Sequence, residues 1–121
     1  MQIADLSELR SFTTLDGSVI RELAGPAWTA VRHQSLAEAT VPPGGETAEH
    51  FHPRSEEIYY FTAGTGRMRL DTQEADVRAG NCVVIPPGIV HKLWNPGPDP
   101  LVLLCCCAPA YSDEDTVTTG G

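Results

Sequence analysis

Short runs of β-branched and aromatic residues alternate along the chain with clusters of Gly, Pro, Asp and Ser. Runs of this composition, bounded by turn residues, are typical of β-strands. No long amphipathic helix separates the runs, so the pattern predicts an all-β fold, an antiparallel sandwich or barrel. About nine strands are expected, at 18–23, 28–41, 47–52, 56–63, 67–70, a short segment that ends near 80, 82–85, 89–94 and 101–108.

The two ends of the chain depart from this pattern. Residues 1–17 form a mixed N-terminal arm, in which "DLSELRSF" predicts one or two helical turns with Asp5 or Ser7 as the N-cap. The acidic tail, 109–121, is expected to form a short turn and then to fray. No linker divides the chain, which predicts a single domain, 1–121.

Charge and composition narrow the range of partners. The chain of 121 residues has 16 acidic and eight basic side chains, and its formal net charge is −8. Nucleic acid is not an expected partner, because phosphate binding needs clustered Lys and Arg. No apolar run is long enough to span a bilayer, and the N-terminus lacks the pattern of a signal peptide. We expect a cytoplasmic protein without a membrane partner.

Three of the four cysteines are consecutive, Cys105, Cys106 and Cys107. Neighbouring residues on a strand point to opposite faces, which suits a packed strand better than a disulfide framework. No C-x2-C pair gives the usual spacing of a zinc–thiolate site. We expect all four, Cys82 included, to be reduced and to pack as small buried side chains. A reactive thiol is the alternative.

Candidate chemistry lies in the segment "EHFHPRSEEIYYF". His50 and His52 are two residues apart, so on a strand they share one face. Glu57 begins the next run and shares its face with Tyr59 and Phe61. If these faces form the interior, two imidazoles and a carboxylate lie among apolar neighbours, and burying them unpaired costs several kcal/mol. A metal ion would satisfy all three groups at once.

A third histidine lies on a separate predicted strand. His91 alternates with Ile89 and Leu93, so it also points toward an apolar face. Three imidazoles and one carboxylate suit a divalent transition metal that keeps one or two open positions. Fe, Mn, Ni, Zn and Co all accept such ligands, and ligand type alone does not choose between them. A hydrogen-bonded polar cluster without metal is the alternative.

These residues belong to two longer motifs, through which the sequence resembles the cupin superfamily. The first motif, G-x5-H-x-H-x4-E-x6-G, is met by Gly44, His50, His52, Glu57 and Gly64. The second motif, G-x5-P-x-G-x2-H-x3-N, is met by Gly80, Pro86, Gly88, His91 and Asn95. The resemblance implies a small β-barrel of the double-stranded β-helix, or jelly-roll, type. It also implies a metal held by the three histidines and the glutamate, and frequent homodimers.

Spacing decides between the two adjacent glutamates. Glu56 and Glu57 face opposite ways on a strand, and only Glu57 has the six-residue gap to Gly64 that the first motif requires. Glu57 is therefore the predicted ligand, and Glu56 is expected to face outward. Tyr59 is expected to pack in the core and His33 to lie at the surface or at a strand edge. Both are candidates for lining the pocket as the alternative.

The resemblance does not identify a reaction, because one fold hosts dioxygenases, isomerases, epimerases, decarboxylases, cyclases, and binding and storage proteins. The leading hypothesis is a metal-dependent enzyme that acts on a small organic molecule by dioxygenase, isomerase, epimerase or cyclase chemistry. The alternative is a non-catalytic protein that binds a sugar or an organic acid with the help of the metal. Arg67 and Arg69 share a face and are expected to be solvated, with a clamp for an anionic substrate as the alternative.

A homodimer is expected, because a barrel of this size has exposed strand edges that need cover. The apolar run at 18–23 is the candidate for pairing across a two-fold axis, the commonest symmetry of oligomers. A small molecule and a second copy of the chain are thus the predicted partners.

Overall fold

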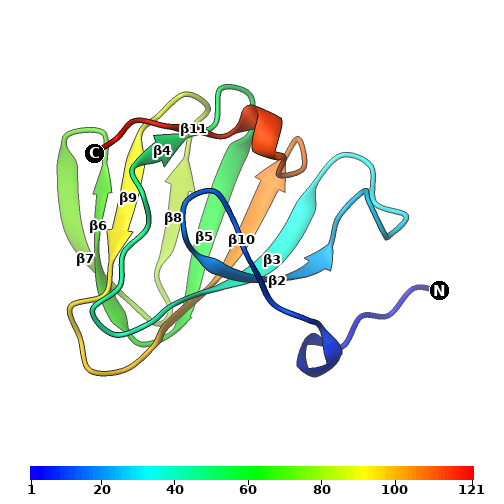
Figure 1. The fold of residues 1–121 in the computed structure, drawn as a ribbon, viewed down its shortest axis with the longest axis horizontal. Coiled ribbons are helices and arrows are strands. Elements are labelled where there is room, and N and C mark those ends of the chain that lie inside the picture. The colour runs from blue at the N-terminus through cyan, green and yellow to red at the C-terminus, as the bar shows by residue number, and fades with distance from the viewer.

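The strands pair into two antiparallel β-sheets that pack face to face, as Figure 1 shows. The computed structural model describes all 121 residues. The larger sheet has the strand order β1-β2-β3-β10-β5-β8, and the smaller has the order β11-β4-β9-β6-β7. The strands are β1 Phe12–Thr13, β2 Val19–Ala24, β3 Ser35–Val41, β4 His50–Phe51, β5 Glu56–Ala63, β6 Thr65–Leu70, β7 Gln73–Arg78, β8 Cys82–Ile85, β9 His91–Trp94, β10 Leu101–Ala108 and β11 Val117–Thr118. The predicted all-β antiparallel jelly roll is confirmed.

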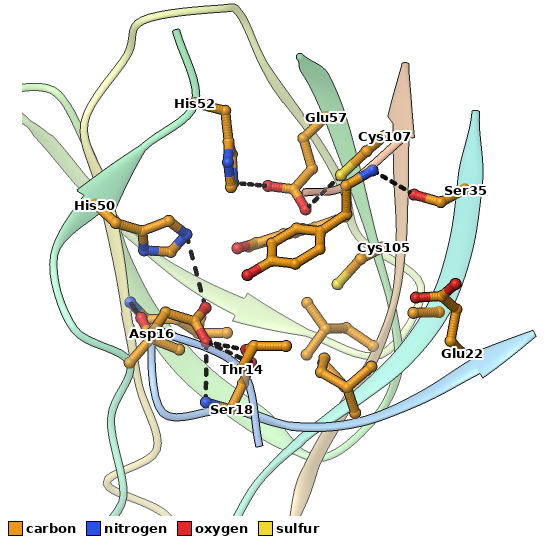
Figure 2. A pocket seen from close by; sticks show the side chains of 18 of the residues that line it. Thr14, Asp16, Ser18, Glu22, Ser35, His50, His52, Glu57, Cys105 and Cys107 are labelled. Carbon is orange, nitrogen blue, oxygen red and sulfur yellow. Dashed lines mark hydrogen bonds and ion pairs between the residues drawn. The ribbon is translucent and has the colours of Figure 1, made fainter. Parts of the chain in front are cut away.

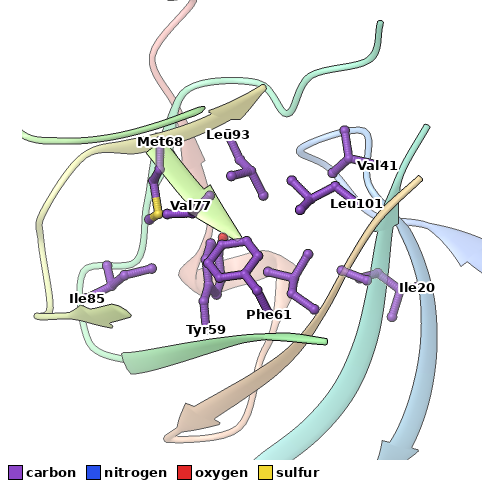
Figure 3. Close-up of a cluster of buried hydrophobic side chains, with 11 residues drawn as sticks. Ile20, Val41, Tyr59, Phe61, Met68, Val77, Ile85, Leu93 and Leu101 are labelled. Atoms are coloured by element: carbon purple, nitrogen blue, oxygen red, sulfur yellow. The ribbon is translucent and has the colours of Figure 1, made fainter. Parts of the chain in front are cut away.

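The hydrophobic core fills the space between the sheets (Figure 3). Strand β5 shows how alternation builds it, because Glu57, Tyr59 and Phe61 point inward while Ile58 and Tyr60 point outward. Burying one large apolar side chain contributes about 1.5–3 kcal/mol relative to exposure, so the cluster holds the sheets together. The buried cluster consists of Ile20, Ala39, Val41, Tyr59, Phe61, Met68, Val77, Ile85, Leu93, Leu101 and Leu103. The alternation that buries Phe61 also carries the Glu57 carboxylate into the interior.

The prediction of a strand over 28–41 is wrong in its first half, because β3 begins only at Ser35. Trp28 and Thr29 lie in a turn, and their N–H groups donate to the carbonyl oxygen of Gly25 at 3.3 and 3.0 Å. The Thr29 hydroxyl donates to the same oxygen at 2.8 Å. A side-chain hydroxyl that bonds to nearby backbone competes with strand pairing. Local hydrogen bonds therefore override the β propensity of this segment.

The N-terminal arm is more structured than its mixed sequence indicates. The helical turn is confirmed as one short 3-10 helix, η1 (Leu6–Glu8), and the Asp5 side chain caps it by accepting from Ser7 N at 3.0 Å. The arm then forms β1, which pairs with the start of β2 in a hairpin that was not predicted. The turn of this hairpin, at 14–18, lies at one end of the space between the two sheets.

The short turn predicted in the acidic tail is confirmed, but the prediction that the tail then frays is wrong. A 3-10 turn, η2 (Asp113–Asp115), leads into β11, which pairs with β4. The Asp115 side chain is buried, and its two carboxylate oxygens accept from the backbone N–H groups of Arg54 and Ser55 at 2.9–3.3 Å. These N–H groups lie in the loop between β4 and β5 and would otherwise lack a partner. The tail thus holds the loop that separates the predicted metal ligands.

Replacing Asp115 is expected to destabilise the fold. Asp115→Ala leaves two backbone donors unpaired in the interior, and such a loss costs about 1–3 kcal/mol. The free energy of unfolding, measured by urea denaturation, should fall by that amount. Glu114→Ala removes a neighbouring exposed carboxylate and serves as the control. Equal stability of the two variants would show that the tail contributes nothing to the fold.

The structure does not test whether the chain forms a homodimer, but it changes which surface is expected to lie between the two copies. The predicted run at 18–23 has no free edge at Val19 and Ile20, because both residues pair with β1 on one side and β3 on the other. Val19 still exposes its side chain, but three exposed apolar side chains lie together on the outer face of β5 and β8, at Ile58, Tyr60 and Val84. The structure contains no helix with the length and hydropathy needed to cross a bilayer.

Light scattering tests the dimer directly. A homodimer should give a particle of twice the 13.0 kDa chain mass at micromolar concentration. Tyr60→Glu places a charge in the exposed apolar face and should shift the particle toward the mass of one chain, because a buried unpaired charge is costly. A wild-type particle of 13.0 kDa would contradict the prediction.

Candidate metal centre

Four side chains from different segments meet between the sheets at one end of the sandwich. His50 lies on β4 and is paired in register with His91 on β9, while His52 follows β4 directly. Glu57 comes from β5 of the opposite sheet. One ring nitrogen from each histidine lies within 4.8 Å of the others. Figure 2 shows the His50, His52 and Glu57 side chains converging on this region.

The histidines are oriented by backbone carbonyl groups. Each Nδ1 atom lies at hydrogen-bonding distance from a carbonyl oxygen, which can only accept, so Nδ1 carries the hydrogen. The Nε2 atom of the neutral ring is then a lone pair directed at the centre of the cluster. The carbonyl partners are Ala48 O for His50 at 2.8 Å, Asp115 O for His52 at 3.1 Å and Ile89 O for His91 at 3.0 Å.

The Glu57 carboxylate faces the same centre. Its Oε1 atom lies 3.3 Å from His52 Nε2 and 3.5 Å from His91 Nε2. Both Glu57 Oε1 and His91 Nε2 are buried without a hydrogen-bond partner. Buried polar atoms without partners are rare and costly in native proteins. Acceptors that face one another in the interior need a cation between them, and imidazole and carboxylate are good ligands of divalent transition metals. The cluster therefore could hold a metal.

The pKa shifts of these groups describe the cluster without a metal. Burial alone raises the pKa of Glu57, but its interactions with the nearby His52 and His91 outweigh burial and lower that pKa to about 2. Burial lowers the pKa of His50, and His91 lowers it further. Burial also lowers the pKa of His52, yet Glu57 and Asp115 more than compensate, so it is raised overall. Without metal, a proton on His52 would partly neutralise Glu57, and a metal would have to displace it.

A pocket opens beside the cluster, and its charged lining is acidic. Asp16, Glu22 and Glu57 line it, whereas no arginine or lysine does. The two arginines that were candidates for an anion clamp lie elsewhere. Arg67 forms exposed ion pairs on the outer surface with Glu74 and Asp76 at 3.3 and 3.1 Å, and Arg69 pairs with Glu49 and stacks on Trp94. The expectation that Arg67 is solvated is confirmed.

The two predicted pocket residues differ in their positions. Tyr59 is buried, lines the pocket and lies with its ring centroid 5.9 Å from that of His91. Burial raises the pKa of Tyr59 well above its usual value, so its hydroxyl stays protonated. His33 does not line the pocket, because it is exposed in the bend before β3. His33 thus has the surface position that was expected for it, and the alternative of a place in the pocket is wrong.

The consecutive cysteines alternate as predicted. Cys105 and Cys107 face the pocket, and Cys106 points to the opposite side of β10. The Cys107 thiol donates to Glu57 Oε2 at 3.2 Å, and burial raises the pKa of both pocket-facing thiols. All four cysteines are free, but Cys82 is exposed, so its predicted burial is wrong.

The sequence did not reveal several residues beside the cluster. Asp16 Oδ2 lies 3.6 Å from His50 Nε2, and Tyr111 from the tail packs its ring edge-on against His52. The only sequence signal for Asp16 was a short polar turn, "TTLDGS", in an arm that no motif covers. The motif asparagine, by contrast, is structural, because Asn95 Nδ2 donates to Val41 O and Asp99 O at 2.9 and 2.8 Å.

His52→Ala is expected to lower metal occupancy sharply. The substitution removes one of the three converging imidazole lone pairs. Affinity for the metal should fall at least about tenfold, because even the loss of a residue that only hydrogen-bonds to a metal ligand has an effect of this size. Elemental analysis of protein purified without chelator measures occupancy. Glu56→Ala is the matched control, since Glu56 is exposed on the outer face of β5. A wild-type protein that stays metal-free when offered Fe, Mn, Ni, Zn and Co in turn would refute the site.

The chain matches a family model of the cupin domain over residues 37–107. A protein of Methanocaldococcus jannaschii, described only as uncharacterized, is 46% identical over 112 residues, which cover 93% of this chain and 90% of that protein. Protein SchB of Streptomyces halstedii is 35% identical over 81 residues, which cover 67% of this chain and 59% of that protein.

Solved structures with the same fold are more distant in sequence. A variant of Streptomyces Pac13 with uridine superposes with a TM-score of 0.78 at 18% identity, and covers 98% of this chain and 89% of its own. Pac13 is described as a nucleoside dehydratase. The oxalate decarboxylase of Lactobacillus farciminis, in its formate complex, also has a TM-score of 0.78, at 24% identity, over 93% of this chain and 34% of its own. These likenesses show the fold alone.

Proposed function

The chain belongs to the cupin family, and we propose that it is a metal-dependent enzyme that acts on a small organic molecule at the site formed by His50, His52, His91 and Glu57. One observation carries the proposal. Glu57 Oε1 and His91 Nε2 are buried acceptors without partners, and they face each other at 3.5 Å. A site for a cation accounts for this arrangement, whereas a cluster without metal, even with His52 protonated, leaves His91 Nε2 buried without a partner.

The protein's own residues prepare the site for catalysis. The carbonyl groups of Ala48 and Ile89 hold two imidazoles in fixed orientations, and the Cys107 thiol holds Glu57 Oε2, so Oε1 is left for the metal. Such outer contacts typically tune affinity at a metal site. The metal, when bound, supplies Lewis-acid or oxygen-activating chemistry at a position that the protein leaves open. The apolar pocket walls exclude water from the bound substrate.

The charge of the pocket limits the substrate class. Its lining includes three carboxylates and no arginine or lysine, so it offers an anionic substrate no permanently charged basic side chain. A dicarboxylate or a sugar phosphate normally needs Arg or Lys for its second charged group. We therefore favour a neutral or cationic small molecule with an oxygen atom that can approach the metal. The uridine in the Pac13 structure is a neutral molecule of this kind, although the likeness to Pac13 concerns the fold.

His91→Gln is expected to abolish turnover while leaving the fold intact. Glutamine has a similar volume and hydrogen-bonding capacity, but a neutral amide is a poorer metal ligand than imidazole. A screen of small neutral and anionic compounds under air and under nitrogen should first identify a substrate of the wild-type protein. The variant should then show weakened metal binding and no turnover, with an unchanged circular dichroism spectrum.

A matched control is His33→Gln, which makes the same replacement at an exposed histidine outside the pocket. It should retain both metal and turnover. Turnover by His91→Gln after its metal has been removed would exclude metal catalysis. A wild-type protein that consumes no compound, but whose melting temperature rises when a sugar or an acid binds, would favour the non-catalytic binding protein instead.

A further inference from the structure

The turn between β1 and β2 carries a carboxylate to the metal pocket. The backbone closes tightly, because Gly17 N donates to Thr14 O at 3.0 Å and Thr14 N donates to Ser18 O at 3.1 Å. Gly17 has a φ of +87°, a conformation that favours glycine. The carbonyl oxygen of Asp16 accepts from Ala48 N at 2.7 Å and ties the turn to the segment just before His50. The turn is thus anchored beside the cluster.

The Asp16 side chain is held in one orientation. Its Oδ1 atom accepts three hydrogen bonds, from Thr14 Oγ1 at 2.6 Å, from Ser18 N at 2.9 Å and from Ser18 Oγ at 2.6 Å. The Oδ2 atom has none of these partners and points at His50 Nε2, 3.6 Å away, as Figure 2 shows. The Asp16 side chain is only 12% exposed. Three donors of the turn therefore bind Asp16 Oδ1, and Asp16 Oδ2 is left directed into the pocket.

Asp16 and His50 also approach each other through two atoms that can only accept a hydrogen bond. The Nδ1 atom of His50 faces the Ala48 carbonyl oxygen, so Nε2 of the neutral ring is a lone pair that faces a carboxylate oxygen. The two carboxylates reach different imidazoles, since Glu57 lies near His52 and His91. Asp16 and Glu57 thus flank the group of histidines with one unengaged oxygen each.

We propose that Asp16 is a fifth protein ligand of the metal centre, and that its Oδ2 atom takes one of the positions left open by the three histidines and Glu57. The inference rests on the metal site of the proposed function. A second carboxylate would balance the charge of a divalent ion. No arginine or lysine of the pocket is available to balance the charge of Asp16 instead.

Cobalt binding tests the assignment without reference to activity. Metal-free wild-type protein, Asp16→Asn and Glu22→Gln are titrated with Co²⁺, and the dissociation constant and the visible absorption spectrum are recorded. Asparagine keeps the acceptor at Oδ1 but is a weaker ligand, so affinity should fall at least about tenfold and the visible bands should change. Glu22→Gln removes another pocket carboxylate, whose Oε1 accepts from Trp28 Nε1, and should behave as wild type.

A second variant keeps the test decisive if Asp16→Asn does not fold, as judged by circular dichroism. In Asp16→Cys a ligating thiolate should add an intense sulfur-to-cobalt charge-transfer band in the near ultraviolet, which the wild-type protein lacks. The inference would be overturned if Asp16→Asn kept wild-type affinity and unchanged visible bands. It would also be overturned if Asp16→Cys kept wild-type affinity without the new band. Either outcome would leave Asp16 as an ion-pair partner of His50. Failure of the wild-type protein to bind Co²⁺ would instead refute the metal site itself.

Discussion

Hydrogen bonds that the three imidazoles donate to backbone carbonyl oxygens are the interactions on which the candidate centre depends. They assign the hydrogen to Nδ1 of His50, His52 and His91 and direct three Nε2 lone pairs inward. The resulting array of buried acceptors is costly without a positive charge, because the interior offers no water to replace lost partners. This cost is the physical reason to place a cation there.

The rest of the fold can be understood as support for that array. Pairing of β4 with β9 sets His50 beside His91, and the opposite sheet brings Glu57 from β5 across the core. The tail contributes twice through one residue, since the carbonyl oxygen of Asp115 contacts His52 and its carboxylate holds the loop after β4. Segments that look peripheral along the chain therefore complete the site.

The distribution of charge separates the site from the surface. Arginines form ion pairs on the outside of the small sheet, where solvent screens them and each exposed pair contributes about 0–1 kcal/mol. The pocket, by contrast, is lined by Asp16, Glu22 and Glu57 and by no arginine or lysine. Relatives of this fold act on chemically different molecules, so the pocket of each chain has to be interpreted from its own side chains.

By itself the sequence determined the strand pattern, the inward faces of His50, His52, Glu57 and His91, and membership of the cupin superfamily, because side-chain alternation and motif spacing are local properties. The tertiary structure alone decided that Asp16 faces His50, that the tail orders over β4, and that His33 stays outside the pocket. Each of these depends on which loop closes over which end of the sandwich. That choice is made by packing and hydrogen bonds between segments far apart along the chain, as between Asp115 and Ser55, and no local pattern records it.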